Sequence, residues 1–225
     1  IIHFMFNINY YLNYSNLLFK VKFKIPYYYN IKYYKMKLVY FNGRGLAETT
    51  RLLLAINNVK YEDFRYPLKI IDWATHNMVK EEFEQAKSDG KLVGSLNKVP
   101  FLEVDGHVIP QSKAIERFVG NKYNMMGDDA LQYSRIDSIC ECVRDFKDTY
   151  QSVRRLPKEE KENGMTKWFS ETLVERLESL EKILCKEHEH FSVGTRLSLS
   201  DVVLYALATQ FFDDKDSVSK SMANC

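Results

Sequence analysis

The chain has 225 residues, of which 45% are apolar and 28% are charged, and its formal net charge is +2. This size and composition predict one large folded domain or two small ones, and they exclude a disordered or collagen-like chain. The near balance of acidic and basic residues argues against nucleic-acid binding. No stretch approaches the ~18 consecutive uncharged apolar residues of a membrane-spanning helix.

Residues 1–35 differ in composition from the rest of the chain. They contain no Asp, Glu, Gly or Ala, and they are rich in Tyr, Asn, Ile and Lys. We expect this segment to be a non-native or disordered extension, such as translated upstream sequence, with Met36 at the composition break. A signal peptide is the rival interpretation, but Asn and Tyr interrupt every apolar run, and no Ala or Gly offers a cleavage site.

The residues after Met36 alternate strand and helix patterns. Residues 37–41 are β-prone, residues 46–57 have helical periodicity, and residues 59–65 alternate as a half-buried strand does. The expected apolar face of the helix holds Leu46, Thr49, Thr50, Leu53 and Ile56. A strand, a helix and a strand of these lengths form a βαβ unit, so the two strands should be parallel.

The next segment predicts a helix, a hairpin and a second helix. Residues 72–87 have the pattern of an irregular, charged helix. Two apolar runs, 99–104 and 107–109, are separated by Asp105-Gly106, which is a strong hairpin signal. Ser112 then begins a helix with an apolar side made of Ile115, Phe118, Val119 and Tyr123.

The second half of the chain carries helix patterns only. Residues 131–154 form one long helical run, and residues 165–186 follow with an apolar stripe. The stripe consists of Met165, Trp168, Phe169, Leu173, Leu177, Leu180 and Leu184. Ser198 and Asp201 form a capping box that should begin a buried helix over 199–212.

These patterns predict a fold of class α/β plus all-α. The first domain, residues 36–123, has the order β-α-β, α, β-β-α, and the second, residues 130–225, is all-helical. The boundary is expected near 124–129. The order of elements alone does not fix the function, which depends on individual residues.

The cysteines and histidines do not have metal-ligand or redox spacing. None of the four cysteines forms a CxxC pair, and His188 and His190 have no matching Cys pair. We therefore expect neither a zinc site nor a redox dithiol. Few, unpatterned cysteines fit a reducing cytosol, so a cytoplasmic location is expected.

Two positions in the first domain are candidates for binding chemistry. Tyr40 lies at the carboxyl end of the first strand, where ligands bind in open α/β sheets, and its hydroxyl can donate to a thiolate or oxyanion. The alternative is a tyrosine that only packs there. In Lys98-Val99-Pro100, a cis proline would let the Val99 main chain pair with a peptide. The alternative is an ordinary proline at the start of a strand.

Two further positions lie on helices. Gln111-Ser112 stands at a helix start, where a Ser N-cap and free amides favour a carboxylate, although a plain N-cap is the alternative. Asp145 lies on the long helix, where a solvated charge is the alternative.

The order and spacing of these residues carry a family resemblance. The run from Tyr40 to Glu48 (YFNGRGLAE) resembles the opening of the sigma-class cytosolic glutathione transferases, and the alpha class is similar. Residues 100–106 followed by 111–115 match the same family, as does 193–201. The resemblance covers the chain from Met36 to about Phe212.

The resemblance implies a thioredoxin-like N-terminal domain, a helical C-terminal domain, a homodimer and glutathione as co-substrate. Tyr40 matches the catalytic tyrosine, which hydrogen-bonds the glutathione sulfur as a donor and favours the thiolate. Asp145 matches the acid that reaches the γ-glutamyl amine of glutathione bound by the other subunit. The remaining glutathione contacts are implied for Trp73, Lys98, the Val99 main chain, cis Pro100, Gln111 and Ser112.

The implied activity is attack of the activated thiolate on hydrophobic electrophiles, a detoxification reaction. A free thiol with a pKa of ~8.5 is mostly protonated at neutral pH, so its activation is the main chemical task. The electrophile pocket is expected between residues 41–44 and the long helix, with Phe41, Gly43 and Tyr150 as candidate walls. A core position is the alternative for Tyr150.

Three departures from the family pattern bear on these expectations. Leu46 stands where many sigma and alpha members carry an Arg close to the catalytic tyrosine. Arg144, beside Asp145, disfavours the divalent-ion site of some prostaglandin D synthases of the sigma class, so no metal is expected. The family continues for one or more helices past the equivalent of residues 213–225, so the helical domain is expected to be truncated.

Two other functions share the same implied site. A glutathione-dependent isomerase, similar to prostaglandin D synthase, needs the same thiolate. A non-catalytic, crystallin-like relative is the other alternative, which Leu46 favours and which Tyr40, Gln111, Ser112 and Asp145 oppose. The sequence leaves the electrophile open.

Overall fold

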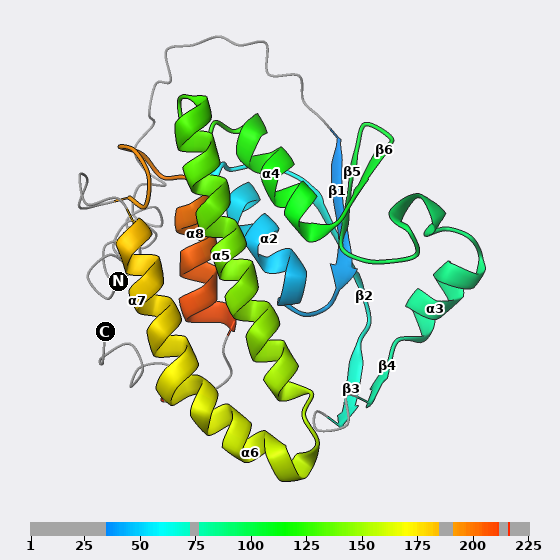
Figure 1. Ribbon diagram of the computed structural model, residues 1–225. Coiled ribbons are helices and arrows are strands. Elements are labelled where there is room, and N and C mark those ends of the chain that lie inside the picture. Colours follow the sequence, from blue (N-terminus) through cyan, green and yellow to red (C-terminus); the bar gives the residue numbers. More distant parts are fainter. Residues whose placement is uncertain (1–34, 73–76, 185–190, 212–215, 217–225) are drawn as a thin grey trace. The chain divides into compact units, whose positions relative to one another are not determined.

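The computed structural model describes residues 35–72, 77–184, 191–211 and 216 (Figure 1). Contacts within it divide these residues into two units, one ending at Tyr123 and the other starting at Asn124. Each unit is described below by itself. Trp73 and all but the last residue of the 1–35 segment lie outside the described residues.

A four-stranded mixed sheet is the centre of the first unit. Its strands are β1 (Met36–Phe41), β2 (Glu62–Tyr66), β5 (Phe101–Val104) and β6 (His107–Pro110), in the order β2-β1-β5-β6. β1 and β2 are parallel, and β5 and β6 form an antiparallel hairpin, as the sequence predicts. The second strand is Glu62–Tyr66 rather than 59–65. This is a thioredoxin-like domain.

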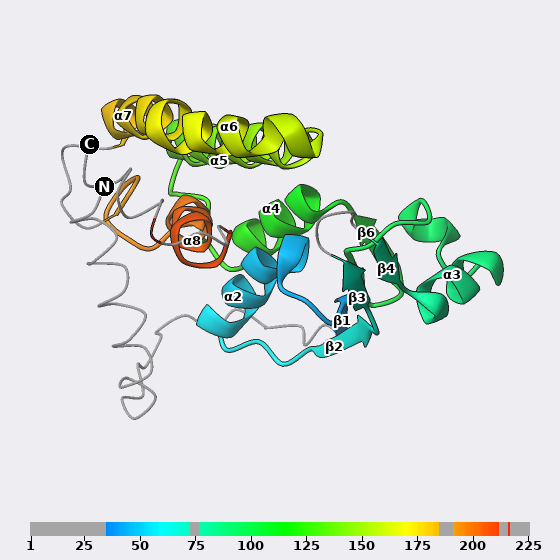
Figure 2. The ribbon, with the colours of Figure 1, turned by 90° about the horizontal axis from the view of Figure 1, so that it is seen from below.

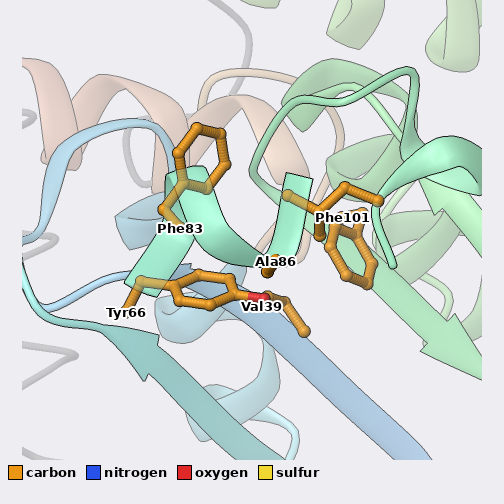
Figure 3. Close-up of a cluster of buried hydrophobic side chains, with 6 residues drawn as sticks. Val39, Tyr66, Phe83, Ala86 and Phe101 are labelled. Carbon is orange, nitrogen blue, oxygen red and sulfur yellow. The ribbon is translucent and has the colours of Figure 1, made fainter. Parts of the chain in front are cut away.

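Helices cover both faces of this sheet. A short 3-10 turn (Gly45–Ala47) leads into α2 (Glu48–Ile56), which packs against α4 (Ser112–Lys122), and α3 (Glu81–Ser88) lies apart from this pair (Figure 2). α3 packs with the sheet through a cluster of buried side chains (Figure 3). The cluster consists of Val39, Tyr66, Phe83, Ala86, Leu92 and Phe101. Because strand residues alternate in direction, Leu38 and Leu102 face the opposite side and are fully buried there.

Two predictions for this unit are wrong. Strands β3 (Lys69–Asp72) and β4 (Asn77–Val79) pair antiparallel, and helix α3 begins only at Glu81. The acidic residues at the start of α3 suit a helix N-terminus, which explains why the charged helical pattern applies only from there. Leu46 does not lie on the buried helix face, because the chain is still in an exposed turn at that point and Leu46 is 57% exposed.

The second unit is helical, as expected. Its helices are α5 (Ala130–Arg154), α6 (Lys158–Lys167), α7 (Leu173–Ile183) and α8 (Leu199–Ala206), and α5 packs against the other three. The Asp129 side chain begins α5 by accepting a hydrogen bond from the Gln132 amide at 2.8 Å. In the described part of the chain, no helix is both long and apolar enough to cross a membrane.

The predicted apolar stripe is buried, but its helix is longer than expected. Helical structure begins at Lys158 and passes through a π-helical segment, Trp168–Thr172, into α7. From Trp168 to Leu180 the stripe residues are buried, whereas Met165 and Leu184 at its ends are only half-buried. The wider π turn changes the spacing without interrupting the buried face.

The capping box at the start of α8 is present as the sequence predicts. The Asp201 carboxylate accepts hydrogen bonds from the amides of Ser192 and Ser198, both at 2.7 Å, and from the Ser198 hydroxyl at 2.6 Å. Burial raises the pKa of Asp201, and the hydrogen bonds from Ser198 and Ser192 oppose that rise. The carboxylate thus joins the loop before α8 to the first turn of the helix.

Candidate active site

The predicted residues of the first unit gather at one edge of the sheet. In the strand register Val39 lies opposite Phe101, and Phe101 lies opposite Pro110. The residues next to these three, Tyr40, Pro100 and Gln111, therefore stand on neighbouring strands at the same edge. This is the carboxyl end of β1, where open α/β sheets bind ligands.

Tyr40 is held by the turn that follows it. The main-chain N–H of Leu46 donates a hydrogen bond to the Tyr40 hydroxyl oxygen at 3.2 Å. A hydroxyl has one proton and two lone pairs, so this contact occupies one lone pair and leaves the proton free to be donated elsewhere. A hydroxyl that accepts a hydrogen bond is also a better donor. Tyr40 is therefore arranged as a hydrogen-bond donor.

The turn brings the main chain of Gly45 so close to the Tyr40 hydroxyl that a side chain at position 45 would collide with it. Gly45 has a φ of +43°, in the region that favours glycine, and a Cβ built there would lie 2.6 Å from the hydroxyl oxygen. A Cβ built at Gly43 would have no other atom within 4 Å. The conformation therefore requires glycine at position 45 but not at position 43.

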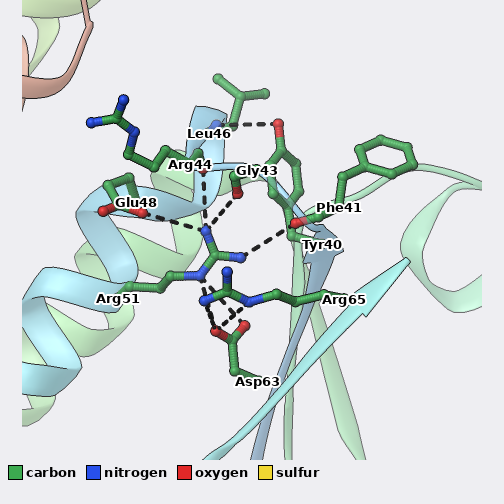
Figure 4. Close-up of polar contacts among 9 residues, drawn as sticks. All are labelled: Tyr40, Phe41, Gly43, Arg44, Leu46, Glu48, Arg51, Asp63 and Arg65. Atoms are coloured by element: carbon green, nitrogen blue, oxygen red, sulfur yellow. Dashed lines mark hydrogen bonds and ion pairs between the residues drawn. The ribbon is translucent and has the colours of Figure 1, made fainter. Parts of the chain in front are cut away.

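Arg51 is a residue of this region to which the sequence analysis assigned no role. Its guanidinium on α2 donates to main-chain oxygens of the turn, including Gly43 at 2.7 Å, and to the Asp63 carboxylate at 3.2 Å (Figure 4). The sequence signal is an arginine three residues after Glu48 in a helix that otherwise holds apolar residues and threonines. Its partner, Asp63, lies on a different element, so the pair cannot be recognised from local spacing.

The strand before the hairpin carries the second group of candidates. The Val99–Pro100 peptide bond is cis, as the family resemblance implies. Val99 is half-buried against the cluster of buried side chains through which α3 packs on the sheet (the α3-side cluster). Lys98 beside it is exposed. The Lys98 amide donates to the Ser95 oxygen at 3.2 Å, which anchors the segment to the preceding 3-10 turn.

The N-cap of helix α4 lies one residue earlier in the chain than expected. The N-cap is Gln111, which has a φ of +72°, and Ser112 is the first helical residue. The prediction of Ser112 as N-cap is therefore wrong, and Gln111 makes no side-chain capping bond. Helix N-termini favour anions, so an exposed Gln111 and a half-buried Ser112 at this end suit a carboxylate.

Phe41 has a packing role that limits its freedom as a pocket wall. Its ring lies 5.2 Å from that of Phe83, and it packs against the α3-side cluster. The Phe41 ring also makes an edge contact with the Tyr40 ring, with the ring centroids 5.5 Å apart. Gly43, in contrast, is exposed in the turn.

In the helical unit, Asp145 is exposed on α5. Its side chain is 62% accessible, and its carboxylate lies 3.9 Å from the Arg144 guanidinium, which also binds Glu141 at 2.7 Å. Asp145 lines a cavity of about 390 Å³ between α5 and α7, together with Cys142 and Arg176. Within the described ranges, no three His, Cys, Asp or Glu side chains are grouped so as to hold a metal ion.

Tyr150 lies in the aromatic core of the helical unit. It is 2% exposed, and its ring lies 4.9 Å from Trp168 and 5.5 Å from Phe211. This burial favours the core alternative over a pocket wall.

Comparisons with known proteins agree with this geometry. Residues 36–121 match the family model "Glutathione S-transferase, N-terminal domain", and residues 144–224 match "Glutathione S-transferase, C-terminal domain". Mouse glutathione S-transferase A3 is 32% identical over 173 residues, which are 77% of this chain and 72% of the relative. The chain belongs to the glutathione S-transferase family. It is a family of enzymes that use glutathione as a substrate.

Solved glutathione S-transferases share the fold. The sigma-class enzyme of Fasciola hepatica has a TM-score of 0.60 and 28% identity, with 84% of this chain and 81% of that one covered. A monomeric glutathione S-transferase of Necator americanus has a TM-score of 0.63 and 24% identity, with 84% and 90% covered. This last likeness supports the fold only. The matched curated relatives include several alpha-class proteins, so the sigma class stays a prediction.

Proposed function

We propose that this glutathione S-transferase binds glutathione at the edge of the sheet and activates its thiol through Tyr40 for attack on hydrophobic electrophiles. The observation that carries the proposal is the hydrogen bond from the Leu46 amide to the Tyr40 oxygen, at 3.2 Å. It leaves the phenolic proton available to a sulfur atom beside it. A donated hydrogen bond favours the thiolate over the thiol and so lowers the pKa of glutathione.

The remaining residues of the edge suit the rest of the tripeptide. The Val99 main chain next to cis Pro100 offers a backbone partner, and Gln111 with Ser112 at the start of α4 offers donors to the γ-glutamyl carboxylate. Lys98 is an exposed cation beside them. Trp73 is proposed for the glycyl end by resemblance alone.

The electrophile is proposed to meet the thiolate beside the turn after β1. Gly43 is exposed there and leaves open space. Phe41, whose ring is in edge contact with that of Tyr40, contributes an aromatic edge. An electrophile held beside the thiolate gains from proximity. Conjugation of such compounds is a detoxification reaction, and a cytoplasmic location is proposed for it.

The first test measures the ionisation of bound glutathione. The ultraviolet thiolate band is recorded against pH at saturating glutathione for the wild type, Tyr40→Phe and the matched control Tyr123→Phe, a half-buried tyrosine in the same unit. We expect the wild type and the control to ionise well below the free-thiol pKa of ~8.5, and Tyr40→Phe to return to it. Glutathione bound without any shift in the wild type would instead favour a crystallin-like binding role.

We further propose a homodimer in which Asp145 of one subunit reaches the glutathione amine in the other. Its support is the exposed carboxylate on α5 and the family resemblance. Asp145→Asn should weaken glutathione binding without loss of helicity, whereas Asp148→Asn, an exposed acid on the same helix, should not. Light scattering reports the oligomeric state, and a monomer that binds glutathione normally would remove Asp145 from the site.

Mixed subunits separate action across the interface from action within one chain. A heterodimer of Tyr40→Phe and Asp145→Asn subunits has one intact site only if the two residues of a site come from different subunits. We therefore expect the mixture to recover activity that neither homodimer has. Absence of recovery, with heterodimers demonstrated by mass spectrometry, would place both residues on one chain.

A further inference from the structure

The side chain of Arg51 lies against the turn that follows Tyr40. Arg51 is on α2 and is only 8% exposed. We propose that Arg51 is a positioning residue for Tyr40, because its guanidinium fixes the turn that supplies the amide donor to the Tyr40 hydroxyl. This inference rests on the proposed role of Tyr40 as the donor to the thiol.

The guanidinium binds three carbonyl groups of this one turn. Nη1 donates to the Gly43 oxygen at 2.7 Å and to the Arg44 oxygen at 3.4 Å, and Nη2 donates to the Phe41 oxygen at 3.5 Å. The N–H groups of a guanidinium are fixed in one plane, so acceptors bound to it keep a fixed arrangement relative to one another. The main chain from Phe41 to Arg44 is held in this way.

Other contacts hold the two ends of the turn: the Asn42 amide donates to the Tyr66 oxygen at 3.0 Å, and the Ala47 amide donates to the Arg44 oxygen at 3.3 Å. Every side chain from Asn42 to Leu46 is exposed, so apolar packing contributes little to the conformation of the turn. Hydrogen bonds from a charged donor are stronger than those between neutral groups. Arg51 therefore supplies a charged constraint on the Gly43 carbonyl, and it shares the Arg44 carbonyl with the Ala47 amide.

Carboxylates hold the guanidinium in place and compensate its charge. Arg51 Nε donates to Asp63 at 3.2 Å, and Nη1 lies 3.4 Å from the Glu48 carboxylate. Arg65 also donates to Asp63, at 2.9 Å through Nε. Because Asp63 lies on β2, in register with Leu38 on β1, these contacts join α2 to the strand pair that carries Tyr40. A buried cation is tolerated only with partners of this kind.

The far end of the same turn reaches the Tyr40 hydroxyl. Arg51 binds the carbonyls of Phe41, Gly43 and Arg44, and two residues after Arg44 the Leu46 amide donates to Tyr40. The guanidinium also lies over the Tyr40 ring, 5.9 Å from its centre (Figure 4). Gly45, between these contacts, passes so close to the hydroxyl that a Cβ there would clash. Loosening the turn would therefore displace the amide from the hydroxyl.

The test compares two changes at Arg51 with one at Arg65. Arg51→Met keeps the apolar stem and removes every donor, and Arg51→Lys keeps the charge but not the planar set of donors. Arg65→Met is the matched control, since Arg65 binds the same Asp63 carboxylate but is 46% exposed. The readouts are the pH midpoint of bound glutathione thiolate and the affinity for S-methylglutathione, which has no thiol to ionise.

We expect Arg51→Met to raise the pH midpoint by about one unit, which is about a tenfold change in the ionisation constant of the bound thiol. Arg51→Lys should lie between this variant and the wild type, and Arg65→Met should match the wild type. S-methylglutathione should bind all folded variants similarly. If Arg51→Met does not fold, Arg51→Lys decides, and a wild-type midpoint in that variant overturns the inference.

The outcomes separate this inference from the proposed function. A wild-type midpoint equal to that of free glutathione overturns the proposed role of Tyr40, and the inference with it. If the wild-type midpoint is lowered and Arg51→Met keeps the same midpoint, only this inference is overturned. The contacts of Arg51 with the turn would then be structural only. An equal shift in Arg65→Met also overturns it, since the effect would follow Asp63 rather than the turn.

Discussion

The main-chain amide of Leu46 donates to the hydroxyl oxygen of Tyr40 across 3.2 Å, while the Leu46 side chain is 57% exposed. The family resemblance implies an arginine at this position in many sigma-class and alpha-class members. Here the main-chain N–H provides the contact with Tyr40, so every residue type except proline can make it. The side chain at position 46 is therefore free to change without loss of the hydrogen bond.

Leu46→Arg should add to thiol activation without changing the fold. An exposed cation near the site favours a thiolate, but solvent and salt weaken it, so we expect the pKa of bound glutathione to fall by about 0.5 unit at low ionic strength. The thiolate titration measures this, with Leu46→Gln as the uncharged control. A shift that persists in high salt, or that Leu46→Gln reproduces, would contradict an electrostatic cause.

Gly45→Ala should impair both stability and thiol activation. The residue has a φ of +43° and its new Cβ would meet the Tyr40 hydroxyl at 2.6 Å. We expect a loss of about 1–2 kcal/mol in the free energy of unfolding, together with a raised pKa of bound glutathione. Gly43→Ala is the control, because open space surrounds that position. Urea unfolding and the thiolate titration check both, and equal behaviour of the two variants would refute the steric argument.

Asp201→Ala should be among the more destabilising changes in the helical unit. It leaves the buried amides of Ser192 and Ser198 without their acceptor. Each unsatisfied buried donor costs about 1–3 kcal/mol, so we expect a total loss of about 2–6 kcal/mol for the two. Asp129→Ala removes an exposed N-cap and should cost about 1 kcal/mol. Urea unfolding followed by circular dichroism distinguishes them, and similar losses would show that burial adds nothing.

The Cys142 thiol should react slowly with alkylating agents. Burial raises its pKa above the ordinary value of 9.0, and the negative charge of Asp145 raises it further. Since the thiolate is the reactive form, labelling near pH 8 should be slower than for a free cysteine and should rise only at higher pH. Mass spectrometry of the Cys142 peptide measures the rate. Labelling as fast as that of N-acetylcysteine would show that the thiol is neither shielded nor shifted.

The same shift has a consequence for stability. A thiol whose folded pKa is raised binds its proton more tightly in the folded state than in the unfolded state. Its contribution to stability is fully present below the ordinary pKa and is lost as pH rises through the folded value. Cys142→Ser should remove this part of the decline in stability above pH ~9.

Much of the fold was predictable because it follows local patterns. The Asp105-Gly106 hairpin, the parallel pair of β1 and β2, and the Ser198–Asp201 capping box each depend on residues close together in the chain. The strand pair at 69–79 was missed, because its short strands compete with a charged pattern that also suits a helix. Local propensity is a weak signal where few residues are buried.

The sequence by itself determined the family and the candidate residues, because Tyr40, Pro100 and Gln111 occur in an order and spacing that resemble the glutathione transferases. Only the tertiary structure decided how Tyr40 is held. Its partner is a main-chain amide, which every residue type except proline offers, and the turn is bound by Arg51, whose anchor Asp63 comes from another element. Periodicity reports which face of an element is buried, but it does not report which distant groups meet there.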